Sequence, residues 1–210
     1  MEKMKPISSK DAIEFLLPRH YSGRKPQISL AFGWYQKNVL RAVCTFGKPA
    51  SYTLCKGICG EQYSSNVYEL NRLCRDDNFE KFLSKFVGFC LRYISKEKHW
   101  IIVSYADTGM CHNGYIYQAC NFIYTGCTKR RTDKYTEGNK HSRHYNNFQQ
   151  QGLRKVRTAK HRYVYFATNN KRLKKKWMGV LSYPICNYPK AQNKNYILGD
   201  YFEPEIIKTN

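Results

Sequence analysis

The segment from Ser104 to Thr125 constrains the fold of this chain more than any other. It begins at the end of an apolar, β-branched run (residues 100–105) and passes Asp107 and a short polar loop. It continues as a helix that carries Tyr117 and ends in a second strand that starts at Phe122. Short apolar runs with β-branched residues are typical of buried strands. Two such strands joined through a helix favour a sheet with helices on its faces.

The rest of the chain supplies more elements of both kinds. The expected strands are residues 27–32, 39–46, 67–75 and 162–168, the first two forming a hairpin. The expected helices are residues 11–17 and a long amphipathic one from Phe79 onward, capped by residues 76–78. Residues 47–62, with three glycines and a proline, are expected to be a loop. The order predicts an α/β (α+β) fold, a mixed and mostly antiparallel sheet flanked by helices, in a single domain over residues 1–210.

The charge of the chain is strongly basic and unevenly distributed. It has 36 Lys and Arg against 15 Asp and Glu, a net charge of +21. Residues 129–176 hold 16 of these cations and only two acids, Asp133 and Glu137. Such an excess indicates a polyanionic partner, nucleic acid before a membrane surface. Within this segment, residues 171–176 are expected to be a plain phosphate-binding arm, and residues 187–210 a tail that packs on the surface.

The N-terminal residues predict no signal peptide, because their apolar run is short and they contain acids. No run of 18 apolar residues is present, so no membrane span is expected. The nine cysteines show no paired spacing. We therefore expect a cytoplasmic protein with reduced thiols.

The pattern Tyr117-x-x-x-Asn121-Phe122 resembles the helix–strand signature Y-x-x-x-G-F of acyl-CoA N-acyltransferases, the GNAT-like fold, with Asn in place of Gly. Further short motifs, in this order and spacing, resemble the phage Mom family of DNA adenine-modification proteins. These motifs are His20-Tyr21-Ser22, Glu69-Leu70-Asn71-Arg72-Leu73, Ser104-Tyr105-Ala106-Asp107-Thr108-Gly109, Gly114-Tyr115-Ile116-Tyr117-Gln118-Ala119, Lys140-His141-Ser142-Arg143-His144-Tyr145 and Lys160-His161-Arg162-Tyr163.

The resemblance implies a function as well as a fold. It implies transfer of a methylcarbamoyl-type group to the N6 atom of adenine in double-stranded DNA, which protects phage DNA from host restriction. It also implies the use of acetyl-CoA and a bound iron ion.

Two residues of the opening segment are the first catalytic candidates. A phenol at the position of Tyr117 can give a proton to the departing thiolate of an acyl-CoA. Asp107 follows a buried strand, where open sheets bind ligands, and it would hold a metal, accept a proton from the adenine amine or fix a neighbour. The alternatives are a packed helix tyrosine and a turn cap. We expect Asp107 and Tyr117 to face one common cleft.

His20 and Tyr21 are the next catalytic candidates. An imidazole and a phenolate are competent iron ligands, and with Asp107 they would form the metal site that the resemblance implies. The alternative is a solvent-facing loop or one that contacts phosphate.

Four residues of the strand at 67–75 are candidates for holding the cofactor: Asn71, Arg72, Leu73 and Arg75. In N-acyltransferases this strand pairs with the pantetheine arm, and the next helix receives the pyrophosphate at its N-terminus. The usual glycine-rich loop is missing here, and the carboxylates at residues 76 and 77 would repel phosphate. Arg72 and Arg75 would compensate as a joint clamp, or they are ordinary surface arginines.

The basic segment supplies the candidates for contact with DNA. Its cations would bind phosphates, and its aromatic side chains would stack on an exposed base, since an enzyme acting on adenine N6 must flip the base out of the duplex. The candidates are Lys129, Arg130, Arg131, Lys140, His141, Arg143, His144, Tyr145, Lys160 and Arg162.

Two other functions remain open from the sequence. One is an ordinary GNAT-type acetyltransferase acting on a protein or a small amine, in which the basic segment is incidental. The other is a non-enzymatic DNA-binding protein on a degenerate fold.

Overall fold

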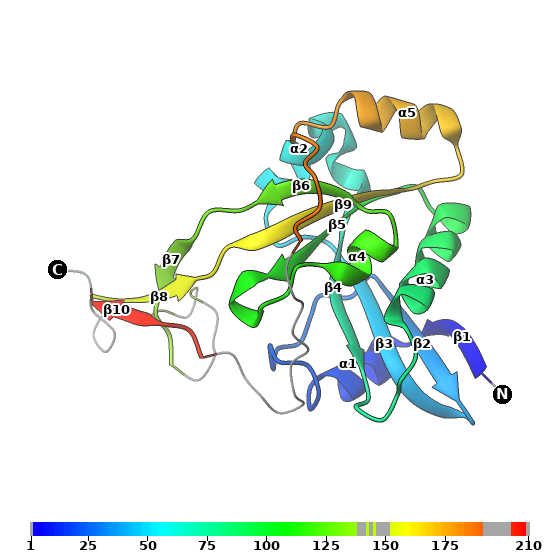
Figure 1. Ribbon diagram of the computed structural model, residues 1–210, viewed down its shortest axis with the longest axis horizontal. Helices are drawn as coiled ribbons and strands as arrows, with labels where there is room; N and C mark the ends of the chain where they lie inside the picture. Colours follow the sequence, from blue (N-terminus) through cyan, green and yellow to red (C-terminus); the bar gives the residue numbers. More distant parts are fainter. Residues whose placement is uncertain (1, 138–141, 143–144, 146–151, 191–202, 209–210) are drawn as a thin grey trace.

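The computed structural model describes residues 2–137, 142, 145, 152–190 and 203–208, and it is built on two sheets (Figure 1). The larger sheet has seven strands, in the order β1-β2-β3-β4-β5-β9-β6. Its strands are β1 (Glu2–Ile7), β2 (Leu30–Gln36), β3 (Val39–Gly47), β4 (Val67–Arg75), β5 (Trp100–Asp107), β9 (Lys160–Ala167) and β6 (Ile123–Cys127). All neighbours are antiparallel except β4 and β5, so the predicted mixed, mostly antiparallel sheet is confirmed.

Helices cover both faces of this sheet. They are α1 (Ser9–Leu16), α2 (Tyr52–Cys59), α3 (Leu83–Glu97), α4 (Tyr115–Ala119) and α5 (Lys171–Gly179). Strand alternation shows which helices pack on which face, because successive side chains of a strand point to opposite faces of the sheet. Ile102 and Ala106 of β5 join the core under α3 and α4, which we call the α3 face. Ile101 and Val103 join the core under α2 and α5, on the face that also packs α1, which we call the α2 face.

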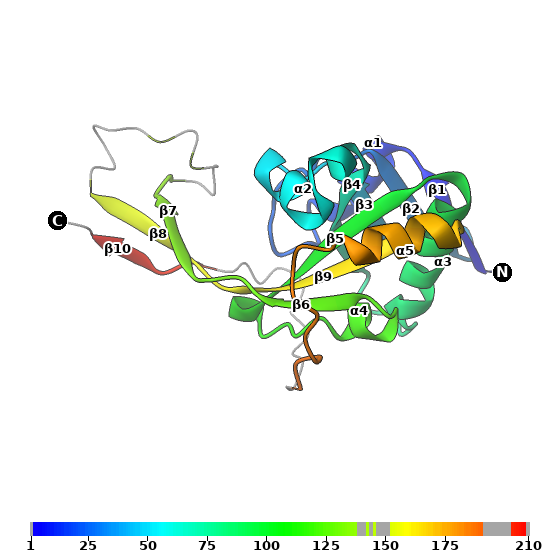
Figure 2. The same ribbon diagram turned by 90° about the horizontal axis from the view of Figure 1, so that it is seen from above.

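The smaller sheet extends from the body as an arm (Figures 1 and 2). Its order is β10-β8-β7, with all pairs antiparallel. The strands are β7 (Arg131–Lys134), β8 (Leu153–Arg157) and β10 (Ile206–Lys208). Since β7 follows β6 and β8 precedes β9, the arm is a continuation of the edge of the large sheet.

The hairpin expected near the N-terminus is confirmed as β2 and β3, whose two-residue turn has positive φ at both Lys37 (49°) and Asn38 (63°). The loop expected over residues 47–62 is wrong. Ser51 caps α2 by accepting a hydrogen bond from the backbone N–H of Leu54 (3.2 Å), and Ile58 packs fully buried on the α2 face. A short 3-10 helix (Glu61–Asn66) follows. Burial of one helix face therefore outweighs the glycine content there.

The start expected for the long helix is also wrong, because α3 begins at Leu83. Phe79 lies before it, buried edge-on against Trp34 (ring centroids 4.8 Å apart). The carboxylate of Asp76 does not cap a helix but pairs with Arg19 (2.7 Å) and Arg41 (3.1 Å). This pairing compensates one of the two negative charges that were expected to repel phosphate.

The tract at residues 171–176 is helical, as part of α5, where a plain arm was expected. Trp177 anchors the helix, fully buried against Phe166 and Tyr63, and Leu173 packs beside it. The side chain of Asn170 caps the N-terminus by accepting a hydrogen bond from the N–H of Leu173 (3.0 Å).

We expect Asn170→Ala to lower the free energy of unfolding by about 1 kcal/mol, because the first turn loses its side-chain acceptor. Urea unfolding of the two proteins measures the difference. Asn170→Asp keeps an acceptor and serves as the control, which should match the native protein to within a few tenths of a kcal/mol. Equal stability of the alanine variant would contradict the capping role.

Among the helices that the structure describes, none has the length and apolar character needed to cross a membrane.

Candidate functional site

The two parallel strands of the large sheet separate part way along their length. Backbone pairing of β4 with β5 covers only three residues of each strand, Val67–Glu69 against Ile101–Val103. Beyond this point β4 stays with β3 and β5 stays with β9. Just past the last pair, the Ser104 hydroxyl donates a hydrogen bond to the carbonyl of Leu70 (2.9 Å). The sheet therefore has a split between β4 and β5, which begins beside Glu69 and Ser104 where their backbone pairing ends.

Tyr117 reaches this split from the α3 face. Its ring lies between Phe122 and Tyr163 (centroids 5.4 and 5.3 Å), and its hydroxyl is hydrogen-bonded to Ser104. Burial raises the pKa of Tyr117 far above its ordinary value, although the bond to Ser104 opposes this. The phenol stays protonated, as a proton donor must.

The helix of Tyr117 ends in the way that the signature predicts. Asn121 has φ of 58°, in the left-handed region. Glycine adopts this conformation most readily, and asparagine is among the few other residues that tolerate it. The replacement of Gly by Asn in the pattern therefore preserves the backbone path from α4 into β6.

Glu69 lies on the opposite side of the same point, on the α2 face, where it pairs with Val103. Burial raises its pKa, while the positive charges of Arg72 and Lys160 act in the other direction. The negative charge of Glu69 also contributes, after burial, to the raised pKa of Tyr117. Sequence reasoning placed Glu69 in a family motif but assigned it no role.

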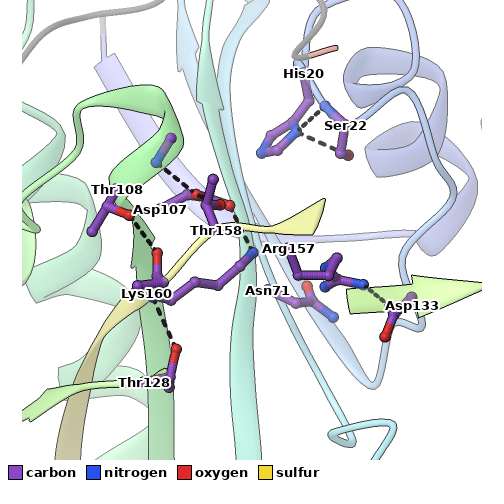
Figure 3. A network of polar contacts seen from close by, with 12 residues as sticks. His20, Ser22, Asn71, Asp107, Thr108, Thr128, Asp133, Arg157, Thr158 and Lys160 are labelled. Carbon is purple, nitrogen blue, oxygen red and sulfur yellow. Dashed lines mark hydrogen bonds and ion pairs between the residues drawn. The ribbon is translucent and has the colours of Figure 1, made fainter. Parts of the chain in front are cut away.

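Asp107 lies on the α2 face at the end of β5, and it fixes the start of β9 (Figure 3). Oδ1 accepts hydrogen bonds from the N–H of Gly109 (3.0 Å) and the hydroxyl of Thr158, and Oδ2 pairs with the Lys160 ammonium (2.9 Å). Burial raises the pKa of Asp107, but Lys160, Thr158 and Gly109 outweigh it and the net shift is downward. An ionised carboxylate whose two oxygens are both bonded is a weak base. This geometry therefore supports a role for Asp107 in holding neighbouring residues in place and in capping the turn that follows it.

Asp107 and Tyr117 do not share one face of the sheet, contrary to the expected common cleft. Strand alternation places Ser104, the partner of Tyr117, on the α3 face and Asp107 on the α2 face. The two residues meet the split from opposite sides. The carboxylate near Tyr117 at the point where β4 and β5 separate is Glu69.

His20 and Tyr21 lie together beside the α2 face, in the loop after α1. Their rings stack with centroids 4.4 Å apart, and His112 approaches Tyr21 edge-on (6.0 Å). Nδ1 of His20 accepts a hydrogen bond from the N–H of Ser22 (3.2 Å). Burial, with the nearby Arg72 and His112, lowers the pKa of His20 to about 3. Burial, with the charge of Asp107, raises the pKa of Tyr21 to about 12.

Because the pKa of His20 is lowered and that of Tyr21 is raised, both side chains are uncharged at neutral pH. They form a neutral, polar lining close to Asp107. His112 belongs to the same cluster but was missed, because it falls in a turn whose position depends on a bond from its own N–H to the carbonyl of Asp107 (3.1 Å). No sequence pattern indicated that contact.

The residues of this cluster do not fit an iron site as they stand. Imidazole, phenolate and carboxylate are suitable ligand types, but both oxygens of Asp107 are already bonded and one faces the Lys160 ammonium. Within the described part of the chain, no group of three or more His, Cys, Asp or Glu side chains is arranged to hold a metal ion. The iron implied by the resemblance therefore has no support from these residues.

The four cofactor candidates on β4 are divided between the two faces. Arg72 pairs with Thr45 and lies on the α2 face, whereas Arg75 pairs with Ala42 and lies on the α3 face. The guanidinium of Arg75 donates to the carbonyls of Phe79 (2.8 Å) and Lys81 (3.1 Å), which shapes the segment before α3. The joint clamp of the two arginines is therefore not formed.

The other two candidates differ in what they can offer a cofactor. Asn71 sits at an irregularity in the pairing of β3 with β4. Its side chain accepts from the Thr45 hydroxyl (2.6 Å) and donates to the carbonyl of Gln27 (2.8 Å), so it is occupied within the fold. Leu73 packs against the core of the α3 face. What remains for an extended ligand is the main chain of β4 along the split.

Six of the ten DNA-contact candidates are described by the structure. Lys160 and Arg162 lie on the α2 face. The Cζ atom of Arg162 stacks 3.3 Å from the ring centroid of Tyr183, and its Nε donates a hydrogen bond to the Thr125 hydroxyl (2.9 Å). Arg131 begins β7 in the arm. The remaining candidates in the described residues are Lys129, Arg130 and Tyr145, while Lys140, His141, Arg143 and His144 lie outside them.

Solved structures similar to this chain are acetyltransferases. One is a probable acetyltransferase from Staphylococcus epidermidis, 10% identical with a TM-score of 0.49 over 80% of this chain and 100% of that chain. A putative acetyltransferase from Salmonella typhimurium, solved with its cofactor acetyl-CoA, is 7% identical with a TM-score of 0.49 over 81% and 96%. An N-acetyltransferase from Staphylococcus aureus Mu50 is 12% identical with a TM-score of 0.48 over 80% and 98%.

The GNAT-like fold of this chain rests on its strand order and on the parallel pair that splits. Comparison with curated proteins finds no match. A family model for the Mom protein family matches residues 2–190, and the chain therefore belongs to that family.

Proposed function

We propose that this chain transfers a group derived from acetyl-CoA to the N6 atom of adenine in double-stranded DNA, leaving a methylcarbamoyl-type modification that protects the DNA from host restriction. The observation that carries the proposal is the split between β4 and β5. A protonated phenol, Tyr117, flanks it on one face, and a carboxylate of raised pKa, Glu69, flanks it on the other. Membership of the Mom family supports DNA as the acceptor.

The residues around the split fit an acyl-CoA. Main-chain groups of β4 beyond Glu69 have no partner strand on the β5 side in the described ladder, and amides of an extended thioester arm can pair with such an edge. Acetyl-CoA would supply the acyl group in activated form. Tyr117 then lies where a thiolate leaves, on the α3 face.

The transfer step balances with two proton movements. The N6 nitrogen forms a bond to the acyl carbon as the bond from that carbon to sulfur breaks. Glu69 accepts the proton that N6 loses, and Tyr117 gives its proton to the departing thiolate. Two carboxylates lie on the α2 face, Glu69 and Asp107. Glu69 is the better base because its pKa is raised, whereas Lys160 holds Asp107 in its ionised form. A methylcarbamoyl group contains a nitrogen that an acetyl group lacks, and we assign no residue to the step that introduces it.

The cationic α2 face favours DNA over a small amine or a lysine-rich peptide. Arg72, Lys160 and Arg162 lie beside the split on this face, and a cationic acceptor would be repelled by them. The phosphates of DNA would instead be attracted.

Mass spectrometry of nucleosides tests the proposal. DNA from cells that express the chain should contain a modified deoxyadenosine that is missing from cells carrying an empty vector. A normal nucleoside profile, with the folded protein present at high level, would exclude adenine modification as its function.

A further inference from the structure

Helix α5 carries five cations and no acid. Its buried side is formed by Leu173 and Trp177, which pack in the core of the α2 face. Within the described ranges of the chain, none of the five cations forms an ion pair. The helix therefore presents a positive charge that no described carboxylate pairs with. The five cations are all exposed: Lys171, Arg172, Lys174, Lys175 and Lys176.

The helical period of 3.6 residues divides these cations by direction. Two of them flank the buried side and lie over aromatic rings, Lys174 over Tyr165 and Lys176 over Tyr63, each 5.8 Å from the ring centroid. The other three lie opposite Trp177 and point outward. We call this outward set the α5 basic face: Lys171, Arg172 and Lys175.

The α5 basic face is unfavourable for the helix itself. Lys171 and Arg172 occupy the first turn, where the positive end of the helix dipole favours acids. Lys175 follows Lys171 by four residues, the spacing at which like charges on a helix repel. The helix is held instead by the Asn170 cap and by burial of Trp177. An external anion therefore explains the position of these cations better than the stability of the fold does.

The α5 basic face and the cations of the candidate site lie on the same side of the sheet. Lys160 and Arg162 are on the α2 face at the start of β9, and α5 packs on the α2 face after the end of β9 (Figures 1 and 2). Strand β9 has eight residues, so its two ends are roughly 25 Å apart. That separation corresponds to about seven base pairs of duplex DNA.

Duplex DNA fits these two cationic regions better than the other anions available to the protein. Its phosphates repeat along the duplex, so one molecule can meet both regions at once. Acetyl-CoA would meet Tyr117, which enters the split from the α3 face. Helices that bind membrane surfaces insert their apolar face between lipids, and in α5 that face is buried against the body.

We propose that the α5 basic face binds the sugar–phosphate backbone of the DNA duplex about seven base pairs from the adenine that is modified. The inference rests on the proposed function and deepens it, because it sets the length of duplex that the enzyme engages. Contacts with phosphates carry no sequence information. The α5 basic face would therefore add affinity and orient the duplex without selecting a sequence.

Binding measurements with matched triple variants test this surface. The α5 triple variant combines Lys171→Gln, Arg172→Gln and Lys175→Gln. It should bind a duplex of about 30 base pairs roughly 30-fold more weakly, and the slope of log K against log salt should fall by about 2 to 3, as expected for lost phosphate contacts. Its melting temperature should be no lower than that of the native protein, because the unfavourable charges of the helix are removed.

The control removes the same charge from the opposite side of the sheet. The α3 triple variant combines Arg92→Gln, Lys96→Gln and Lys98→Gln, at exposed positions in α3 and directly after it. It has the same net charge as the α5 triple variant, so it accounts for long-range attraction of DNA. It should keep the salt slope and most of the affinity. Neither variant should change the affinity for acetyl-CoA.

Duplex length gives a second measurement. A duplex of about 12 base pairs with the target adenine at its centre ends before the α5 basic face, whereas one of about 30 base pairs extends past it. The native protein and the α3 triple variant should bind the longer duplex roughly tenfold more tightly, and the α5 triple variant should lose most of this difference.

The possible outcomes separate this surface from the proposed function. Equal losses for the two triple variants, or no loss for either, would overturn the α5 surface while modified adenine still supports the proposed function. Weaker binding of acetyl-CoA by the α5 triple variant would assign the cations to the cofactor instead. Binding to anionic lipid vesicles that only the α5 triple variant loses, with DNA binding unchanged, would assign them to a membrane. DNA binding that depends on α5 without any modified adenine would overturn the proposed function alone.

Discussion

Tyr117→Phe should reduce the rate of group transfer by roughly 100-fold or more, the range expected when a positioned general acid is lost. The substitution removes only the hydroxyl that is bonded to Ser104, so the ring contacts with Phe122 and Tyr163 remain. Affinity for duplex DNA should stay within twofold, because the cationic face lies on the other side of the sheet. Single-turnover rates with saturating acetyl-CoA measure the effect.

Tyr115→Phe is the matched control for this variant. Tyr115 begins the same helix, but its side chain is exposed (66%). It should keep the full rate. If Tyr117→Phe also transferred the group at the native rate, Tyr117 would be a packing residue of α4, and the proton for the thiolate would come from elsewhere.

Glu69→Gln should reduce the transfer rate about as much as Tyr117→Phe does. It should also remove the part of the pH dependence of the rate that comes from ionisation of Glu69. In the native protein the rate should rise with pH as Glu69 loses its proton, and burial moves this rise to higher pH than for an ordinary glutamic acid. Gln cannot accept the proton, so the remaining rate should be flat over the same interval. Rates measured from acidic to neutral pH reveal the change.

The stability of this variant separates catalysis from folding. A carboxyl whose pKa is higher in the folded than in the unfolded state favours folding when protonated, and this advantage is lost as pH rises through the folded pKa. At neutral pH Glu69→Gln should therefore melt no lower than the native protein. Glu80→Gln, at an exposed position before α3, should retain both the rate and the pH profile. A lower melting temperature for Glu69→Gln, with an unchanged pH profile, would make Glu69 a structural partner of Arg72 and Lys160.

Local sequence patterns predicted the parts of the fold that depend on local chemistry. The hairpin of β2 and β3, the strand of Asp107 and the helix of Tyr117 each have a periodicity or a turn that is readable over a few residues. The Asn121 position in the signature corresponds to a left-handed residue in the structure. Helix α2 could not be predicted in this way, since it depends on burying Ile58 and two cysteines against strands distant in sequence.

The candidate site was only partly predictable for the same reason. Family motifs identified Tyr117, Asp107, His20 and Tyr21, but the face on which each lies is set by strand register. Strand register places Arg72 and Arg75 on opposite faces of the sheet and brings Glu69 to the point where β4 and β5 separate. The downward pKa shift of Asp107 depends on Lys160 and Thr158, more than 50 residues away in the chain. Pairing between distant strands is not encoded in any short pattern.

Transfer of isotope from acetyl-CoA to DNA tests the central claim most directly. Purified protein would be incubated with acetyl-CoA labelled at both acetyl carbons and with an unmodified duplex, and the nucleosides would then be separated. The mechanism at the β4/β5 split predicts label in a deoxyadenosine derivative with the native protein and almost none with Tyr117→Phe. Label found only on protein amines or in free acetate, with the deoxyadenosine unlabelled, would contradict it.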